Sequence, residues 1–505
     1  MFSQTKKAIA WKPKNYVFSI INFLIQSIIM VALAVGVIFI NVLREGDASG
    51  FVDYFSVAGN VQNFVYLSVF TLVLNTGVYL YLYSDLRDFM LKTKNIILVF
   101  LVVIISFILE VILGNYVSIY ARPIALFSLL LLLLINRRTA IALNFIFALF
   151  VFVVDVFTNQ PFDAPTATVS LVMTSAFGIV AVYLVDGIGS RIKTFAMGLV
   201  ISVPIALVTV LLQIIGGADT YNIIIIAAFS VTGGMLSVVV MMILLPIFEW
   251  MFNVLTNFRL EEITDHKSKL IKVLINEAWG TFNHSLVVAS LAETCAAAIE
   301  ENPLLARAAA YYHDIGKLKQ PSYFTENQHG YNPHDDLTPE LSTEIIRSHT
   351  KDGYELIMKH RLPQILADVA REHHGTLPIQ YFYAKAKKYT EGGELDIANF
   401  CYPGPKPRSK IAAIIMLADG CEASVRSLKD RSRDKVEAMV DKIFSDRMEF
   451  NQFSDCDITM REIELIKQAI INGLTGVYHD RIKYPDYVKN ATNAPQMGSN
   501  DNNKG

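Results

Sequence analysis

The chain has 505 residues, of which 53% are hydrophobic, and 44 basic and 46 acidic residues give it a formal net charge of −2. This length allows more than one domain, and the near-neutral charge argues against a surface that binds a nucleic-acid polymer. Residues 1–250 consist of long apolar runs, whereas all ten histidines lie between His266 and His479. The four cysteines also lie in the second half without CxxC spacing, which fits a reducing compartment.

The first half contains eight apolar segments that we interpret as membrane spans, because a spanning helix needs about 20 apolar residues. After an N-terminal segment of residues 1–16, the transmembrane region of residues 17–248 opens with one span. A short outer loop at 43–62 separates that span from the next seven. The eight segments are 17–42, 63–83, 96–114, 121–136, 139–157, 168–185, 195–215 and 222–248.

Three features of this half concern its charges. The adjacent residues Arg137 and Arg138 lie between the fourth and fifth segments and favour a tight turn at the membrane surface. If the N-terminus is inside, most Lys and Arg of the connecting segments are also inside, which predicts that the second half is cytoplasmic. Glu110 is an acid within the third span, where it either marks a relay or ligand site or has a structural role near the interface.

The second half shows the spacing of amphipathic helices, with apolar residues three and four positions apart. A linker helix is expected at 249–280, followed by a soluble domain at 281–488 and a disordered polar tail at 489–505. No clear strand alternation is present, so the domain should be all-α. The helical windows are 285–300, 304–313, 340–358, 363–373, 409–427 and 434–446.

Imidazole and carboxylate groups recur in the order His, His-Asp, His, His-His, Asp across this domain. Such a set can hold two divalent metals, and it suits Mn, Fe or Ni better than Mg. Two metals about 3.5–4 Å apart can activate a water molecule and neutralise phosphoryl oxygens. Asp314 has two carboxylate oxygens and could bridge both metals. If His313 and Asp314 lie on a helix, their side chains project about 100° apart, so both can reach one cluster. The pattern therefore indicates a phosphoester hydrolase with these groups: His284, His313, Asp314, His349, His373, His374 and Asp419.

Ordered motifs along residues 250–487 resemble those of the bacterial seven-transmembrane HD phosphodiesterases of the PgpH type. The motif Tyr-Tyr-His-Asp-Ile-Gly-Lys at 311–317 is accompanied by Gly-Thr-Phe-Asn-His-Ser at 280–285 and His-His-Gly-Thr at 373–376. Further matching segments lie at 302–307, 326–328, 332–335, 348–353, 360–363, 402–407 and 418–423.

The resemblance implies a phosphodiesterase that cleaves cyclic di-AMP to pApA with a centre of two metals, usually iron or manganese. It implies that one metal is held by His284, His313, Asp314 and Asp419. The other would be held by Asp314, His349, His373 and His374, although His374 could instead contact a substrate phosphate.

The resemblance also implies that Asp314 takes part in catalysis. Lys317 is expected either to contact a phosphate or stabilise the leaving group, or to have a structural role. Lys406 and Arg408 lie in the 402–408 segment, which is either a substrate-binding lip or an ordinary loop.

Two departures from the PgpH type stand out. Members usually carry a large extracytoplasmic domain where this chain has only residues 43–62, too few for a folded sensor. Asn283 also replaces a histidine that commonly precedes the ligand corresponding to His284, a change that metal binding should tolerate.

Two alternative functions remain open. One is an HD hydrolase of cyclic di-GMP or (p)ppGpp, although Gly375-Thr376-Leu377-Pro378 differs from the Gly-Tyr-Pro of cyclic di-GMP-specific relatives. The other is a non-catalytic nucleotide-binding membrane receptor, against which the presence of every ligand position argues. The expected partners are a cyclic dinucleotide and the lipid bilayer of the bacterial inner membrane, and a homo-oligomer is left open.

Overall fold

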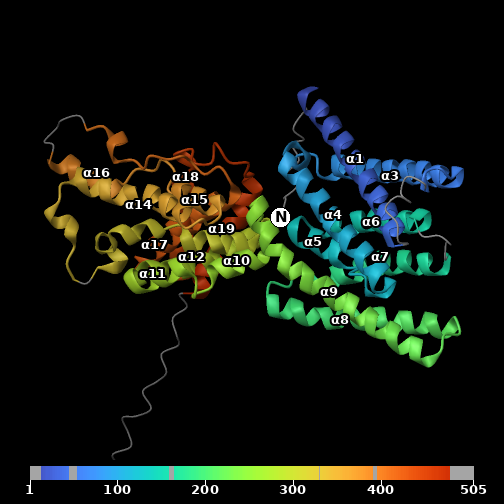
Figure 1. Cartoon of the computed structure of the whole chain (residues 1–505). Helices are drawn as coiled ribbons and strands as arrows, with labels where there is room; N and C mark the ends of the chain where they lie inside the picture. Colours follow the sequence, from blue (N-terminus) through green and yellow to red (C-terminus); the bar gives the residue numbers. More distant parts are fainter. Residues whose placement is uncertain (1–12, 45–53, 159–163, 329, 390–394, 478–505) are drawn as a thin grey trace, which may run out of the picture.

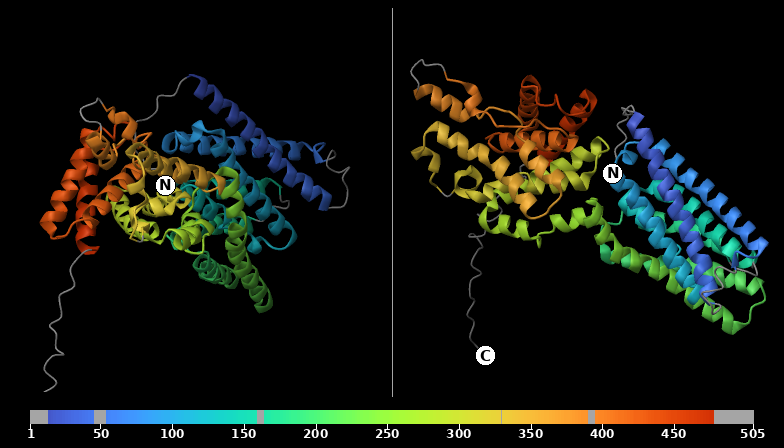
Figure 2. Two further views of the ribbon diagram at one scale, coloured as in Figure 1. Left: turned by 90° about the vertical axis from the view of Figure 1, so that its left-hand side faces the viewer. Right: turned by 45° about the horizontal axis from the view of Figure 1, so that its top comes forward.

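The computed structural model describes residues 13–44, 54–158, 164–328, 330–389 and 395–477. In these ranges the regular structure is helical, no strand is formed, and one isolated bridge pairs Pro378 with Cys401. A bundle of apolar helices lies at one end of the molecule and a second helical body at the other, joined by the end of α9 (Figure 1; Figure 2, right). The all-α class, with membrane helices followed by a helical domain, is confirmed.

The apolar bundle contains one helix for each of the eight predicted segments, in chain order. Six of them are long and apolar enough to cross a membrane, whereas the apolar stretches Ile119–Leu134 and Ser170–Val185 are shorter. The structure thus identifies six full-length candidates among the described residues instead of eight. The helices are α1 Pro13–Arg44, α3 Ala58–Asp85, α4 Thr93–Tyr116, α5 Leu126–Leu134, α6 Arg137–Thr158, α7 Ala164–Val185, α8 Arg191–Ile215 and α9 Thr220–Phe252, with short 3₁₀ turns η1 Phe89–Leu91 and η2 Ile119–Ala121.

The short helix α5 forms the centre of the bundle. It consists almost entirely of leucine, packs against α4, α6, α7 and α9, and its side chains are buried by these neighbours. By contrast, large apolar side chains such as Ile28, Leu80, Val203 and Ile224 are exposed on the outer helices. Apolar side chains both in the interior and on the outer surface are expected for a bundle that is surrounded by lipid.

The predicted surface turn between the fourth and fifth segments is present. Helix α5 ends at Leu134 and α6 begins at Arg137. The side chains of Arg137 and Arg138 are 56% and 70% exposed, and they pair with Asp186 and Asp85. Both arginines therefore avoid the apolar interior.

A buried ion pair joins three helices of the bundle to the segment after η2. The guanidinium of Arg122 donates to both oxygens of Asp155, at 2.6 and 2.8 Å, and to the hydroxyl of Ser170 at 3.0 Å. Gly114 provides the space, because a Cβ atom there would lie 2.3 Å from Nε of Arg122. Glu110, which lies one helical turn before Gly114 on α4, is completely buried among the helices.

We expect Asp155→Asn to destabilise the bundle strongly. The substitution leaves the Arg122 guanidinium buried without its counter-charge, which typically costs about 3–5 kcal/mol. Thermal unfolding of the full chain in detergent should show the loss. Arg138→Gln, which removes an exposed ion pair, is the control and should cost at most about 1 kcal/mol. Equal effects of the two substitutions would contradict a special role of the buried pair.

The connection between the two bodies is not the single linker helix expected at 249–280. Helix α9 ends at Phe252, the next residue Asn253 adopts the left-handed conformation, and two short helices follow: α10 Asn257–Thr264 and α11 Lys269–Glu277. Thr256 caps α10 by accepting a hydrogen bond from the Arg259 N–H. Because α10 packs against α13 (Pro303–Tyr312) of the second helical body, the connection is part of the surface of that body.

The soluble domain is a bundle around α17, whose side chains are nearly all buried between α12, α13, α15, α18 and α19. The six predicted windows correspond to α12–α15, α17 and α18, while α16 and α19 were not predicted. The helices are α12 Trp279–Ala298, α13 Pro303–Tyr312, α14 Pro339–Lys359, α15 Gln364–Glu372, α16 Gln380–Tyr389, α17 Lys410–Arg426, α18 Arg433–Glu449 and α19 Met460–Val477. Five 3₁₀ turns complete the domain: η3 Ile315–Lys319, η4 Pro321–Tyr323, η5 Thr325–Asn327, η6 Pro333–Asp336 and η7 Ile397–Phe400. The predicted tail at 489–505 lies outside the described residues.

Candidate metal centre

Both adjacent pairs of candidate ligands stand just after the end of a helix. His313 follows the last residue of α13, and Asp314 lies in the turn before η3. His373 and His374 follow α15 in the same way. The expectation that both His313 and Asp314 lie within a helix is therefore wrong for Asp314, although both side chains reach one cluster as expected.

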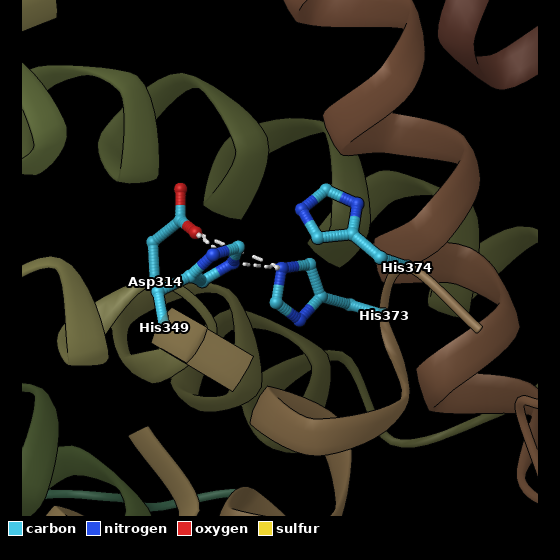
Figure 3. Close-up of side chains that lie close together, drawn as sticks. All are labelled: Asp314, His349, His373 and His374. Atoms are coloured by element: carbon cyan, nitrogen blue, oxygen red, sulfur yellow. Dashed lines mark hydrogen bonds and ion pairs between the residues drawn. The ribbon is translucent and has the colours of Figure 1, made fainter. Parts of the chain in front are cut away.

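The seven candidate side chains nevertheless meet in one place, and they form two sets of four. The first set consists of His284, His313, Asp314 and Asp419, and the second of Asp314, His349, His373 and His374. In each set, one ligand atom per residue lies within 4.8 Å of the others. Figure 3 shows the second set, with the three imidazoles gathered beside the Asp314 carboxylate.

Asp314 belongs to both sets because its two oxygens face different partners. Oδ2 lies 3.2 Å from Nε2 of His313 and 3.8 Å from Nε2 of His284. Oδ1 lies 3.3 Å from Nε2 of His349 and 3.6 Å from Nε2 of His373. One carboxylate thus offers one oxygen to each set, as a bridging ligand would.

Three histidines are oriented by their own backbone. The Nδ1 atoms of His313, His349 and His373 lie 2.7, 2.6 and 2.9 Å from the carbonyl oxygen three residues earlier in the chain. Nδ1 must carry the proton to donate to a carbonyl, so Nε2 presents a lone pair to the cluster. This arrangement is typical of histidines that bind metals.

A carboxylate that sequence reasoning missed orients His284. Oε2 of Glu422 lies 2.5 Å from Nδ1 of this histidine, and Nε2 on the opposite side of the ring lies 2.9 Å from Asp419. Glu422 follows Asp419 by three residues on α17, so both carboxylates lie on one face of the helix. That spacing was a signal from which Glu422 could have been found.

The side chains fit a divalent metal. Nε2 of His313 and Oδ1 of Asp314 are buried without a hydrogen-bond partner, although an unsatisfied buried polar atom is costly. Burial lowers the pKa of His349 to about 4 and also holds the pKa of His374 well below its usual range. Both rings are therefore neutral at neutral pH and can donate a lone pair.

His284 has the opposite electrostatic character. Burial acts to lower its pKa, but the hydrogen bonds to Asp419 and Glu422 outweigh it and raise the pKa to about 10. The two carboxylates thus create a negative electrostatic potential around this ring, which favours the binding of a cation.

The centre opens into a cavity of about 320 Å³, within the usual range of small-molecule sites. His284, His349, His374 and Asp419 contribute to its wall. The ring of Tyr402 stacks on His374 with a centroid separation of 4.3 Å and forms another part of the wall. A ligand in this cavity would therefore lie directly against the two sets.

Lys317 also faces the cavity, but its charge is already paired. Its ammonium lies 2.7 Å from Oδ2 of Asp314 and 2.7 Å from Oε1 of Glu326. Burial and these two carboxylates act in opposite directions, and the carboxylates prevail and raise the pKa of Lys317 above its usual value. The contacts favour the structural alternative for this lysine, in which it neutralises the two acids.

We expect Lys317→Met to destabilise the metal-free protein by about 3–5 kcal/mol, because two buried carboxylates lose their counter-charge. Thermal unfolding after chelation would measure this. Lys319→Met is the matched control, since Lys319 is 68% exposed and should contribute no more than about 1 kcal/mol through Asp352. An unchanged melting temperature for Lys317→Met would instead support a role limited to the substrate.

The two basic residues of the predicted lip are not part of the cavity wall. Arg408 donates to Glu372 at 2.7 Å through Nε, and Lys406 lies 3.3 Å from the hydroxyl of Ser454. The Arg408 guanidinium is thus held against the end of α15, to which Glu372 belongs. A contact of either residue with substrate stays a prediction.

Several residues that the sequence analysis did not single out contribute polar or aromatic groups to the site. Glu422, Glu326 and Tyr402 lie within motifs that carried the family resemblance, but no spacing argument assigned them a role. Arg447 on α18 contributes to the cavity wall and belongs to no motif. Only the packing of α18 against α17 brings it to the site.

Comparison with known proteins agrees with this division of the chain. The HD domain family matches residues 281–424, and the family described as 7TM receptor with intracellular HD hydrolase matches residues 61–256. All seven candidate ligands, from His284 to Asp419, thus lie within the HD domain. Residues 61–256 are thus similar to the membrane part of the 7TM receptors with an intracellular HD hydrolase, and the chain is a multi-pass membrane protein.

Two curated proteins named cyclic-di-AMP phosphodiesterase PgpH are similar over most of the chain. The protein of Listeria monocytogenes is 35% identical over 84% of this chain and 59% of its own length. The protein of Bacillus subtilis is 38% identical over 73% of this chain and 52% of its own length. The chain therefore spans somewhat more than half the length of these relatives.

A solved structure is also similar to the soluble domain. The crystal structure of the L. monocytogenes PgpH HD domain in complex with cyclic-di-AMP has 47% sequence identity and covers 43% of this chain and 99% of that chain, with a TM-score of 0.41.

Proposed function

We propose that this protein is a membrane-bound, metal-dependent phosphodiesterase that hydrolyses cyclic di-AMP to pApA. The observation that carries the proposal is the pair of ligand sets that share Asp314 at the wall of one cavity. The names of the two PgpH relatives support cyclic di-AMP as the substrate.

The two sets would hold two metal ions, most suitably manganese or iron. Their mixture of imidazole and carboxylate donors supports a transition metal over magnesium, which prefers an all-oxygen shell. Bound there, such a pair would supply a water nucleophile at neutral pH and positive charge for the phosphoryl oxygens. His374 is the most accessible ligand candidate, with 22% of its side chain exposed, so it can contribute either to the second set or to a phosphate contact.

The chain's own residues prepare the reaction in three ways. Glu422 holds the ring of His284, and Lys317 fixes the orientation of the Asp314 carboxylate. Tyr402 and His374 form an aromatic wall beside the reacting phosphate. Burial of Asp314 and the imidazoles excludes bulk water from the side opposite the cavity, so the substrate has one direction of approach.

We also propose that the soluble domain is on the cytoplasmic side of a bacterial inner membrane, where a nucleotide messenger is found. The support is the excess of Lys and Arg in the segments assigned to the inner side, among them Arg137 and Arg138 at the α5–α6 turn. A reporter enzyme that works only in the cytoplasm should be active when it is fused after residue 477. Activity of a reporter that works only outside the cytoplasm, fused at the same position, would contradict this topology.

The decisive experiment offers cyclic di-AMP, cyclic di-GMP and (p)ppGpp separately to the purified full chain with Mn²⁺. We expect preferential turnover of cyclic di-AMP and accumulation of pApA. Preferential cleavage of another nucleotide would contradict the substrate but retain the hydrolase. Binding of metal and nucleotide without any turnover would instead support the receptor alternative.

A further inference from the structure

Among the described residues, one basic side chain of the cavity forms no ion pair, although Asp419 and Asp446 act on its charge through space. Three basic residues contribute to its wall: Lys317, Arg426 and Arg447. Lys317 is paired with Asp314 and Glu326, and Nη1 of Arg426 lies 3.6 Å from Glu422. In the described part of the chain, the Arg447 guanidinium has neither an ion pair nor a hydrogen bond.

The position of this guanidinium is unusual for an unpaired charge. Nε of Arg447 is buried without a partner, and burial also lowers the pKa of the group. Arginine stays charged in proteins, and a partly desolvated guanidinium without an anion is unfavourable. A surface arginine would avoid this cost by turning into water, so its position in the cavity needs an anionic partner.

The absence of a side chain at Gly420 lets the Arg447 guanidinium pack closely against α17. A Cβ atom at Gly420 would lie 2.8 Å from Nη2 of Arg447, so any side chain there would displace the arginine head. Gly420 directly follows Asp419, which places the guanidinium beside the first ligand set. The charge is thus held next to the position at which a phosphodiester would react.

The charge of a cyclic dinucleotide matches this arrangement. Such a ligand carries two phosphodiester groups, and the ligand sets can accommodate one of them. Arginine recognises phosphate through paired N–H donors more specifically than lysine does. On the basis of the proposed function, we propose that the Arg447 guanidinium binds a phosphate group of the nucleotide in this cavity.

The test is the equilibrium binding of pApA to the manganese-loaded full chain, measured by calorimetry. Arg447→Gln should weaken binding by about 10- to 100-fold, because it removes a charge-assisted pair of hydrogen bonds. Arg447→Lys should recover part of the affinity, since it keeps the charge but loses the fork geometry. The manganese content of both variants should equal that of the wild type.

Two further variants separate phosphate binding from a general effect on the fold. Lys442→Gln removes the same charge from an exposed position on the same helix and should leave the affinity within about twofold. Gly420→Ala should displace the arginine head and weaken pApA binding in the wild-type background. The same substitution should add little when Arg447 is already glutamine, because coupled residues are not additive.

The outcomes are distinguishable from failure of the proposed function. Wild-type affinity in Arg447→Gln would overturn the inference even if cyclic di-AMP is hydrolysed. A parallel loss of manganese would also overturn it, since Arg447 would then support the ligand Asp419 and not the nucleotide. Weaker pApA binding with unchanged manganese would support it even if cyclic di-AMP were not the physiological substrate.

Discussion

Asp314→Asn should abolish both metal loading and turnover. Each oxygen of Asp314 faces a different ligand set, and asparagine retains only one carbonyl oxygen and no negative charge. We therefore expect less than one metal per chain by elemental analysis, and a decrease in cyclic di-AMP hydrolysis of at least about 1,000-fold.

The matched control is Asp434→Asn, which removes a carboxylate from an exposed position on α18. It should leave metal content and turnover unchanged. Full metal content in Asp314→Asn would show that Asp314 does not bridge the two sets, whatever the effect on turnover.

Glu422→Gln should weaken metal binding in the first set alone. Glutamine has nearly the same shape, but it removes the negative charge that His284 contacts through Nδ1. Loss of such a supporting carboxylate typically costs about 10- to 100-fold in metal affinity or activity. A titration with Mn²⁺ should show one weakened site, and excess Mn²⁺ should restore much of the turnover.

Glu437→Gln is the corresponding control, because Glu437 is exposed on α18 and distant in the chain from any candidate ligand. Unchanged metal affinity in Glu422→Gln would mean that His284 is positioned by its helix alone. A turnover defect that excess metal cannot restore would indicate a direct part for Glu422 in the reaction.

Much of the centre was predictable because its groups are chemically distinctive. Histidine and aspartate are uncommon in helical, apolar surroundings, so His313, His373 and their neighbours stood out from the sequence. The two-oxygen argument for Asp314 also agrees with the contacts in the structure. The local backbone was less predictable, because the apolar spacing of α13 continues to the residue at which the helix ends.

Residues recruited by tertiary packing were beyond such reasoning. Arg447 comes to the cavity only because α18 packs against α17, and nothing in its neighbourhood along the chain marks it. For Arg408, nearness to a loop motif suggested substrate binding, which stays a prediction, but the motif gave no sign that the side chain pairs with Glu372. Helix α16 was missed because it is short, with few apolar positions to set a period.

In the membrane half, too, composition predicted the helices but not how they pack together. Hydropathy located all eight helices, but it could not show that α5 is only nine residues long and enclosed by its neighbours. It also could not place Arg122 beside Asp155, because these residues come from different parts of the bundle.

The backbone contacts of His313, His349 and His373 have a consequence for how the centre is filled. Because each ring is held by a carbonyl of its own helical turn, its tautomer is selected when the helix forms, before any ion arrives. These three positions then require no rotation of the ring to present Nε2 to an incoming ion. The rate of metal uptake into the second set should accordingly be governed by the shedding of water from the incoming ion, and ions that exchange water slowly should load slowly there even where their final affinity is high.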